Sequence, residues 1–200
     1  MQILSEKKIK DVFRAIPEIE TERLTLGKIT VRDTQDMFEY SHLPEVKKFL
    51  TWAPHKTENE TFRYIKLLEK KYSKGAFWDF GVRLRSEGKF IGTCGFTSFD
   101  TDTNSAEIGY VISPFYRGRG IAPEACRAVM KFGFAVFDLD YICARFIKGN
   151  DASEKVMTKL CMKYSDTYVN SYFIKGEYKT VVEYKITSGE FFASAPVVKA

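Results

Sequence analysis

The most informative segment of the chain reads AEIGYVISPFYRGRGIA and covers residues 106–122. Its apolar start predicts a strand, Arg117-Gly118-Arg119-Gly120 predicts a glycine-rich turn, and a helix is expected from Ile121. Glycines let the backbone approach a ligand closely, and the first N–H groups of a helix have no partner within that helix. Together with the helix dipole and the two arginines, these groups predict a cradle for a pyrophosphate.

Two common nucleotide-binding fingerprints do not fit this segment. The phosphate-loop pattern G-x-x-x-x-G-K-[ST] is absent from the sequence. The dinucleotide pattern G-x-G-x-x-G also fails, because Pro123 stands where the third glycine would fall, five residues after Gly118. The turn therefore predicts an anion site of another kind.

Upstream of this segment, alternating apolar residues predict an antiparallel meander that ends in the 106–112 strand. Its first two strands are expected at residues 78–84 and 90–99. In the first of these, Trp78 and Phe80 alternate with Asp79, which is typical of a half-buried strand.

The other elements are expected on both sides of the meander. Before it we expect a strand at 21–29, a helix capped by Asp33, a turn opened by Pro44, and a helix from Thr57 that buries Phe62, Ile65, Leu68 and Tyr72. After it we expect a helix to Phe137, a strand at 141–147, a helix at 153–161, and a hairpin with arms at 169–174 and 178–186.

The chain reads as one domain with two terminal extensions. Ile9, Val12, Phe13 and Ile16 recur at helical spacing before Pro17, so residues 1–20 are expected to be a helical extension that serves as a packing element or a dimer contact. The domain is expected at 21–187 and a loose tail at 188–200.

Composition limits the classes of protein that fit. The 200 residues include 17 Phe and 11 Tyr, which excludes wholesale disorder, and no apolar run approaches the ~20 residues of a membrane span. The net charge of +5 favours weak attraction to anions without the basic stripe of a nucleic-acid binder. Four cysteines without a C-x-x-C pair and only two histidines predict reduced thiols, no metal site and a cytoplasmic location.

Residues 117–122 fit the signature R/Q-x-x-G-x-G/A, and the chain thereby resembles the GNAT acyltransferase superfamily, which binds acetyl-CoA. The surroundings are similar to its branch of ribosomal-protein N-terminal acetyltransferases, the RimJ/RimL type. Matches to that branch run in order from residue 20 to residue 187. They are Thr21 to Leu26, Pro44-Glu45-Val46, the loop of Trp52, Ile91-Gly92 to Gly95-Phe96, Glu107 to Tyr110, and Asn150 to Ser153.

The resemblance implies an α/β (α+β) fold with a mixed, mostly antiparallel sheet of about seven strands and about four helices around it. The strand before the turn would splay from its neighbour and pair with pantetheine, while the turn amides would hold the pyrophosphate. The residues implied for the coenzyme are Tyr110, Val111, Ile112, Arg117, Gly118, Arg119, Gly120, Ile121, Ala122, Asn150 and Ser153.

The reaction implied is direct attack of a neutral amine on the acetyl thioester, so a base must first deprotonate the ammonium form. Glu107 is the candidate base, directly or through water, and the alternative is a solvent-side residue that pairs with a basic neighbour. Ser153 could donate a hydrogen bond to the departing thiolate, or serve only in the first turn of its helix.

The sequence departs from the family pattern at two places. Met157 occupies the position of a tyrosine that serves many members as general acid, and Cys161-Met162 replaces a Gly-Phe pair. Methionine has no proton to donate. Ser153 or solvent would therefore have to protonate the leaving thiolate.

The acceptor site is less well defined in the sequence. Trp52 is the candidate for it, whereas Phe77, Trp78 and Phe80 are expected in the core and His55 on the surface. We predict an N-acetyltransferase that depends on acetyl-CoA and has neither nucleic acid nor membrane as a partner. A homodimer is a possible assembly. A protein N-terminal amine is the expected acceptor. The alternatives are a small-molecule amine (polyamine, amino acid or aminoglycoside-like) and a CoA-binding module with little catalysis.

Overall fold

The structure is a computed structural model that describes residues 4–47 and 54–194. Within these residues the strands are β1 (Ile19–Glu20), β2 (Leu24–Gly27), β3 (Asp79–Leu84), β4 (Phe90–Asp100), β5 (Ser105–Ile112), β6 (Tyr141–Ile147), β7 (Lys163–Ile174) and β8 (Glu177–Thr187). The α-helices are α1 (Glu6–Arg14), α2 (Thr34–Ser41), α3 (Pro44–Lys47), α4 (Glu58–Tyr72), α5 (Ile121–Phe137), α6 (Asp151–Lys159) and α7 (Ser188–Ala193). Two 3-10 helices, η1 (Val31–Asp33) and η2 (Pro114–Tyr116), complete the described elements.

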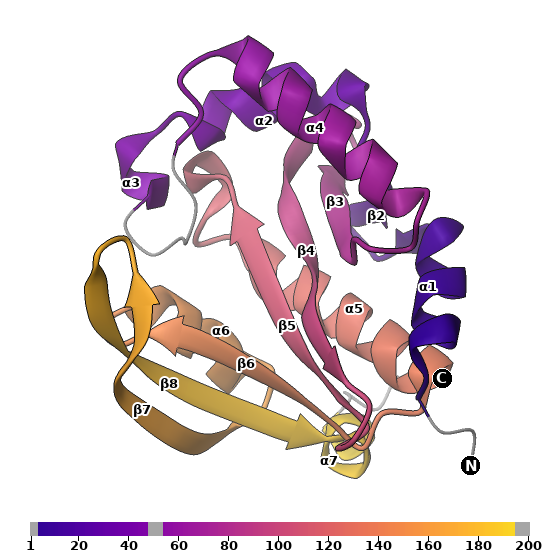
Figure 1. The fold of residues 1–200 in the computed structure, drawn as a ribbon, viewed down its shortest axis with the longest axis vertical. Coiled ribbons are helices and arrows are strands. Elements are labelled where there is room, and N and C mark those ends of the chain that lie inside the picture. The colour runs from indigo at the N-terminus through magenta and orange to yellow at the C-terminus, as the bar shows by residue number, and fades with distance from the viewer. Residues whose placement is uncertain (1–3, 48–53, 195–200) are drawn as a thin grey trace.

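All eight strands belong to one sheet, in the order β1-β2-β3-β4-β5-β6-β8-β7 (Figure 1). Every neighbouring pair is antiparallel except β5 and β6. This confirms the predicted mixed, mostly antiparallel sheet, with eight strands and seven α-helices in the described residues instead of about seven and about four. None of the described helices has the length and apolar character needed to cross a membrane.

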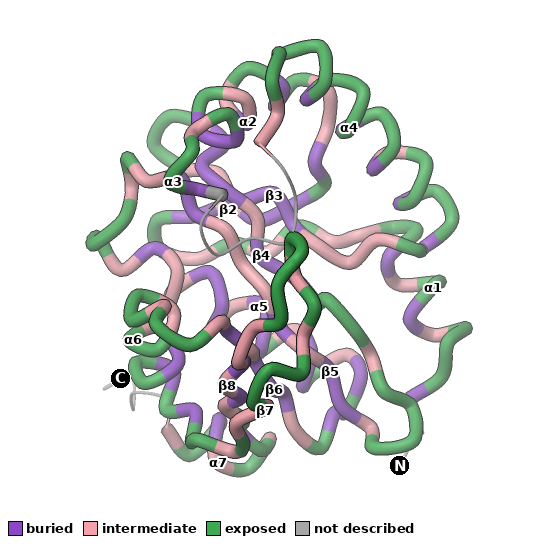
Figure 2. Tube along the Cα trace, turned by 60° about the vertical axis from the view of Figure 1, so that its left-hand side comes forward, coloured by how far each residue is buried: buried purple, intermediate pink, exposed green. Residues whose placement is uncertain are grey.

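Helices cover both faces of the sheet. Strand residues such as Phe80 and Cys94 pack with α1 and α5 in one buried cluster, while Phe90 packs with α2 and α4 in a second one. The half-buried strand predicted at residues 78–84 is therefore covered on both sides, and Gly81 on its polar face is buried. Figure 2 shows these buried inner surfaces beside the exposed tip of the β7–β8 hairpin.

The α1 helix is part of the core. Ser5 caps its start by accepting a hydrogen bond from the Lys8 amide, and the buried side chains Ile9 and Phe13 face the sheet. The Phe13 ring is 0% exposed and stacks on Phe137 with centroids 5.9 Å apart. Aromatic packing of this kind ties the N-terminal helix to the main core.

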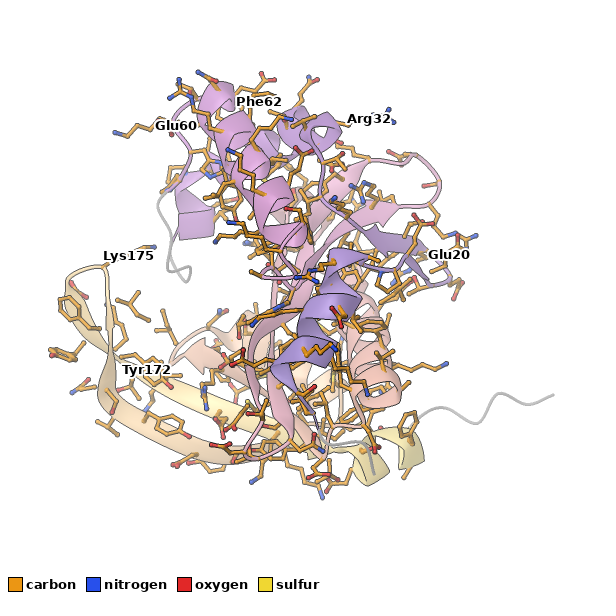
Figure 3. The ribbon with its side chains drawn as sticks, turned by 45° about the vertical axis from the view of Figure 1, so that its right-hand side comes forward. Glu20, Arg32, Glu60, Phe62, Tyr172 and Lys175 are labelled. Atoms are coloured by element: carbon orange, nitrogen blue, oxygen red, sulfur yellow. The ribbon has the colours of Figure 1, made fainter. Side chains whose placement is uncertain are left out.

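Two local predictions need correction. On α4 the buried face consists of Thr61, Ile65, Leu68 and Tyr72, whereas Phe62 is 41% exposed and points away from the sheet (Figure 3). Residue 62 follows the inward-facing Thr61 by about 100° around the helix, so it faces outward.

The C-terminal segment differs as well. Where a loose tail was expected from residue 188, a capping box between Thr187 and Glu190 starts α7. Phe191 of this helix is buried against Phe134, with ring centroids 5.2 Å apart. An apolar contact that is distant in sequence therefore orders this segment.

The feature that positions the site is the separation of β5 from β6. The two strands pair only through Ser105–Glu107 and Tyr141–Cys143, and they diverge beyond that point (Figure 1). β5 continues along β4 up to Ile112, while β6 continues along β8 up to Ile147. The edge of β5 that faces β6 is thus left without a strand partner from Ile108 onward.

Candidate active site

A cavity of about 970 Å³ occupies the space between β5 and β6 and extends toward the α2–α4 layer. Residues 107–112 of β5 and 145–147 of β6 line its walls. The turn before α5 and the start of α6 also border it, and the part of the lining that α2, α3, α4 and β3 supply is called the acceptor end. One continuous space therefore joins the predicted coenzyme residues to a second region suited to an acceptor.

The turn before α5 presents free amide groups to this cavity. Gly118 and Gly120 both have left-handed backbones, with φ of 77° and 75°, and a Cβ added at Gly118 would have no heavy atom within 4 Å. In the described chain, the amides of residues 118–120 donate no hydrogen bond to the protein. Ile121 and Ala122 add the free N–H groups of the first helical turn. Such a group of amides fits a diphosphate.

Arg23 braces this turn from outside. It donates from Nη1 to the Arg119 carbonyl at 2.9 Å and from Nε to the Glu124 carboxylate at 2.6 Å. Thr21 Oγ1 also donates to that carboxylate, at 2.6 Å. The segment of residues 21–26 that matched the family pattern therefore fixes the turn to the first turn of α5.

All the predicted coenzyme residues line the cavity except Arg119. Its guanidinium lies over the Tyr116 ring at 5.4 Å from the centroid. Its carbonyl is held by Arg23. Arg119 therefore contributes its backbone to the turn, while Arg117 is among the residues that line the cavity.

Asn150 and Ser153 come together at the start of α6. Asn150 Oδ1 accepts a hydrogen bond from the Ser153 amide at 3.3 Å and caps the helix, which begins two residues earlier than predicted. Both residues line the cavity, and so does the buried side chain of Met157. Ser153 thus occupies the first helical turn, and the Tyr110 hydroxyl of β5 donates to its carbonyl at 3.5 Å.

Glu107 lies in the cavity wall and is held by an ion pair. Its Oε2 accepts a hydrogen bond from Arg145 Nη1 at 2.7 Å, and Arg145 also contacts Glu183 at 2.6 Å. Burial raises the pKa of Glu107 above its usual value, and the Arg145 guanidinium opposes that effect. Both sequence interpretations of Glu107 therefore describe part of its surroundings: it borders the cavity and it pairs with a basic neighbour.

The acceptor end of the cavity contains residues that sequence reasoning did not select. His55 borders it, although it was expected on the surface, and its Nδ1 lies 2.8 Å from Thr61 Oγ1 and 3.2 Å from Ser41 Oγ. Burial lowers the pKa of His55, which favours the neutral ring at pH 7. Trp52, the acceptor residue predicted from sequence, lies outside the described residues.

Asp79 also borders this end, at the first position of β3. Burial raises the pKa of its carboxyl group to about 7. The Tyr72 hydroxyl donates to the Asp79 carbonyl at 2.6 Å and fixes the backbone there. In the sequence, Asp79 is the one acidic residue among the aromatic residues Phe77, Trp78 and Phe80, which could have drawn attention to it. The alternation of apolar and polar residues along the strand predicted instead that Asp79 faces solvent.

Comparison with known proteins gives a consistent result. Residues 23–163 match the model of the acetyltransferase (GNAT) domain. The chain is 31% identical over 140 residues to the uncharacterized N-acetyltransferase p20 of Bacillus licheniformis, covering 70% of this chain and 79% of that protein. It is 23% identical over 159 residues to spermidine N(1)-acetyltransferase of Escherichia coli K12, covering 68% and 86%.

A solved structure agrees with these matches. The acetyltransferase (GNAT family) from Bacillus anthracis superposes with a TM-score of 0.77 at 28% identity, covering 87% of this chain and 100% of that one. The splayed strands, the amide-rich turn and the sequence matches point to the same assignment. The chain belongs to the GNAT acetyltransferase family and is an acyltransferase that uses acetyl-CoA as its co-substrate.

Proposed function

We propose that the protein transfers the acetyl group of acetyl-CoA to the N-terminal amine of another protein, as an enzyme of the RimJ/RimL type. The observation that carries this proposal is the single cavity that links the amide-rich turn to an acidic acceptor end. Cofactor and amine can approach each other there through the opening between β5 and β6.

On this proposal, the amides of residues 118–122 bind the diphosphate, since the Arg117 amide donates to the Pro114 carbonyl, and Arg117 adds positive charge to the cavity lining. The free edge of β5 at Tyr110, Val111 and Ile112 offers N–H and C=O groups to pantetheine. An amide of this edge would also polarise the thioester carbonyl. Asn150 shapes the adjoining wall by fixing the start of α6.

We assign to Ser153 the role of stabilising the thiolate as it leaves. Ser153 lines the cavity and carries a hydroxyl group, whereas neighbouring Met157 has no proton to give. A hydrogen bond to a charged acceptor is worth about 1.5–3 kcal/mol. This is enough to favour the leaving group without full proton transfer.

Glu107 is the base that the sequence suggests, directly or through water. The Arg145 ion pair competes with that role, because a carboxylate held by a guanidinium is a weaker proton acceptor. Asp79 is a second carboxylate in the cavity lining.

The acceptor is proposed from charge and resemblance. Glu45 and Asp79 give the acceptor end two carboxylates, which suit a cationic amine. The motif series of the RimJ/RimL branch favours a protein N-terminus. A polyamine is the second candidate, since the carboxylates of Glu45 and Asp79 could pair with separate ammonium groups, and a spermidine acetyltransferase is among the relatives.

An acceptor panel tests the proposal. Thiol release from acetyl-CoA is followed with short peptides that have a free N-terminus, with the same peptides N-terminally blocked, and with spermidine. We expect turnover with free peptides and none with blocked ones. Turnover confined to spermidine would support the second candidate. Saturable binding of acetyl-CoA without turnover on any amine would instead indicate a CoA-binding module.

A further inference from the structure

Asp79 is an acidic side chain in the cavity wall that has no side-chain partner among the described residues. No described side chain donates a hydrogen bond or forms an ion pair with its carboxylate, and burial is what perturbs its titration. The β3 backbone around it is fixed by Tyr72, and Phe96 donates from its amide to the Trp78 carbonyl at 3.1 Å. Asp79 is only partly exposed and lines the cavity, so a cationic group of a ligand there could supply the partner that its carboxylate lacks among the described side chains.

The sheet directs this carboxylate toward β5. Asp79 pairs in register with Gly95 on β4, and Gly95 pairs with Gly109 on β5, so the three residues form one row on the same face. A Cβ at Gly95 would lie 2.5 Å from Asp79 Oδ1. The carboxylate therefore lies over Gly95, roughly 5 Å, or one strand spacing, from the Gly109 backbone.

Aromatic side chains from the helix layer surround the same space. Tyr40 from α2 and Tyr64 from α4 line the cavity with Asp79. Burial and then the charge of Asp79 raise the pKa of Tyr64 to about 12. Tyr72 and the Cys94 thiol also lie close enough for the charge of Asp79 to raise their pKa values, after the larger effect of burial.

These neighbours do not neutralise a carboxylate at pH 7, because tyrosine hydroxyls and thiols with raised pKa values stay protonated and uncharged. An ammonium group at this position would meet one negative charge and aromatic rings, the two features that bind organic cations.

We infer that Asp79 binds the ammonium group of the acceptor and accepts its proton before the amine attacks the acetyl thioester. The inference rests on the proposed amine acetylation. The structure shows the carboxylate at the acceptor end, in register with the strand edge that adjoins the coenzyme half of the cavity.

The step balances without any other reactant. One proton passes from the ammonium to the Asp79 carboxylate, and the neutral amine nitrogen forms a bond to the acetyl carbon. The C–S bond breaks, and the electron pair leaves with the thiolate. The second proton of the attacking nitrogen then reaches the thiolate, giving the amide and the free thiol, while Asp79 returns its proton to solvent. A base whose pKa lies near the working pH is suited to this exchange.

The test compares Asp79→Asn with Glu107→Gln and with the control Asp102→Asn, an exposed loop aspartate. The pH dependence of kcat/KM is measured with a free N-terminal peptide and with spermidine at saturating acetyl-CoA. Acetyl-CoA affinity is measured by calorimetry. Carboxyl ¹³C resonances of aspartate-labelled protein are titrated with and without spermidine.

We expect Asp79→Asn to lower kcat/KM at least about 100-fold and to remove an acidic limb near pH 7, while acetyl-CoA affinity stays within about threefold. Glu107→Gln should retain that limb, and Asp102→Asn should match wild type. In the spectra, one carboxyl resonance should titrate near pH 7, respond to spermidine and vanish in Asp79→Asn.

Activity of Asp79→Asn within about threefold of wild type would overturn the inference. So would an acidic limb lost in Glu107→Gln and kept in Asp79→Asn. If wild type binds acetyl-CoA but acetylates neither amine, the proposed function fails separately. In that case, an Asp79 carboxyl resonance whose chemical shift does not change when spermidine is added overturns the inference too.

Discussion

Replacing Asp79 with asparagine should stabilise the protein at alkaline pH. The carboxyl pKa is about 7 in the folded chain against an ordinary value of 3.8, because burial disfavours the charged form. The folded state then binds more protons than the unfolded state between these two values, so the free energy of unfolding of wild type falls as pH rises through that window. Above pH 7 the loss is complete. It amounts to about 4 kcal/mol at most, and less where water in the cavity reaches the carboxylate.

Asparagine carries no charge and escapes this loss. Urea unfolding of wild type and Asp79→Asn at pH 5 and pH 9 measures this loss of unfolding free energy, with Asp102→Asn as the control on an exposed loop. The difference in unfolding free energy should widen in favour of Asp79→Asn by roughly 2–3 kcal/mol between the two pH values, and Asp102→Asn should show no such change. A difference that stays constant with pH would show that Asp79 ionises freely, and the reasoning about its burial would be wrong.

Three further substitutions test other parts of the molecule. Gly120→Glu should weaken acetyl-CoA binding at least about 100-fold in calorimetry, because a negatively charged side chain enters the anion cradle. The control Gly88→Glu, at a similar positive φ in an open turn, should bind acetyl-CoA with normal affinity. Equal affinities of the two variants would refute the placement of the diphosphate. Ser153→Ala should lower kcat about 10-fold or more with little change in acetyl-CoA affinity, and an equal loss of both would reduce Ser153 to a binding role. Phe13→Ala should cost about 3–5 kcal/mol in chemical unfolding, and a loss below about 1 kcal/mol would mean that α1 is not part of the core.

Local patterns predicted the elements whose signals lie within their own sequence. The strand expected at 141–147 is β6, because an apolar run between turn residues sets both ends. The turn before α5 was recognisable because Gly118 and Gly120 adopt backbones that few other residues tolerate. Its neighbours in the cavity then followed from the family pattern.

Contacts between distant segments could not be predicted in this way. Asp33 was expected to cap α2, but its carboxylate pairs with Arg83 from β3 at 2.6 Å. Asp79 was assigned to a solvent face because alternation along one strand contains no information about a second helix layer. α7 likewise depends on the burial of Phe191 against a helix more than fifty residues earlier.

The central claim is that the backbone amides of residues 118–122 bind the diphosphate of acetyl-CoA. Calorimetric titration with acetyl-CoA and with S-acetylpantetheine, which has the same thioester arm but no diphosphate, tests it most directly. We predict saturable binding of acetyl-CoA and at least about 100-fold weaker binding of the shorter thioester, because it cannot reach the turn amides. Equal affinity for the two compounds would contradict the account.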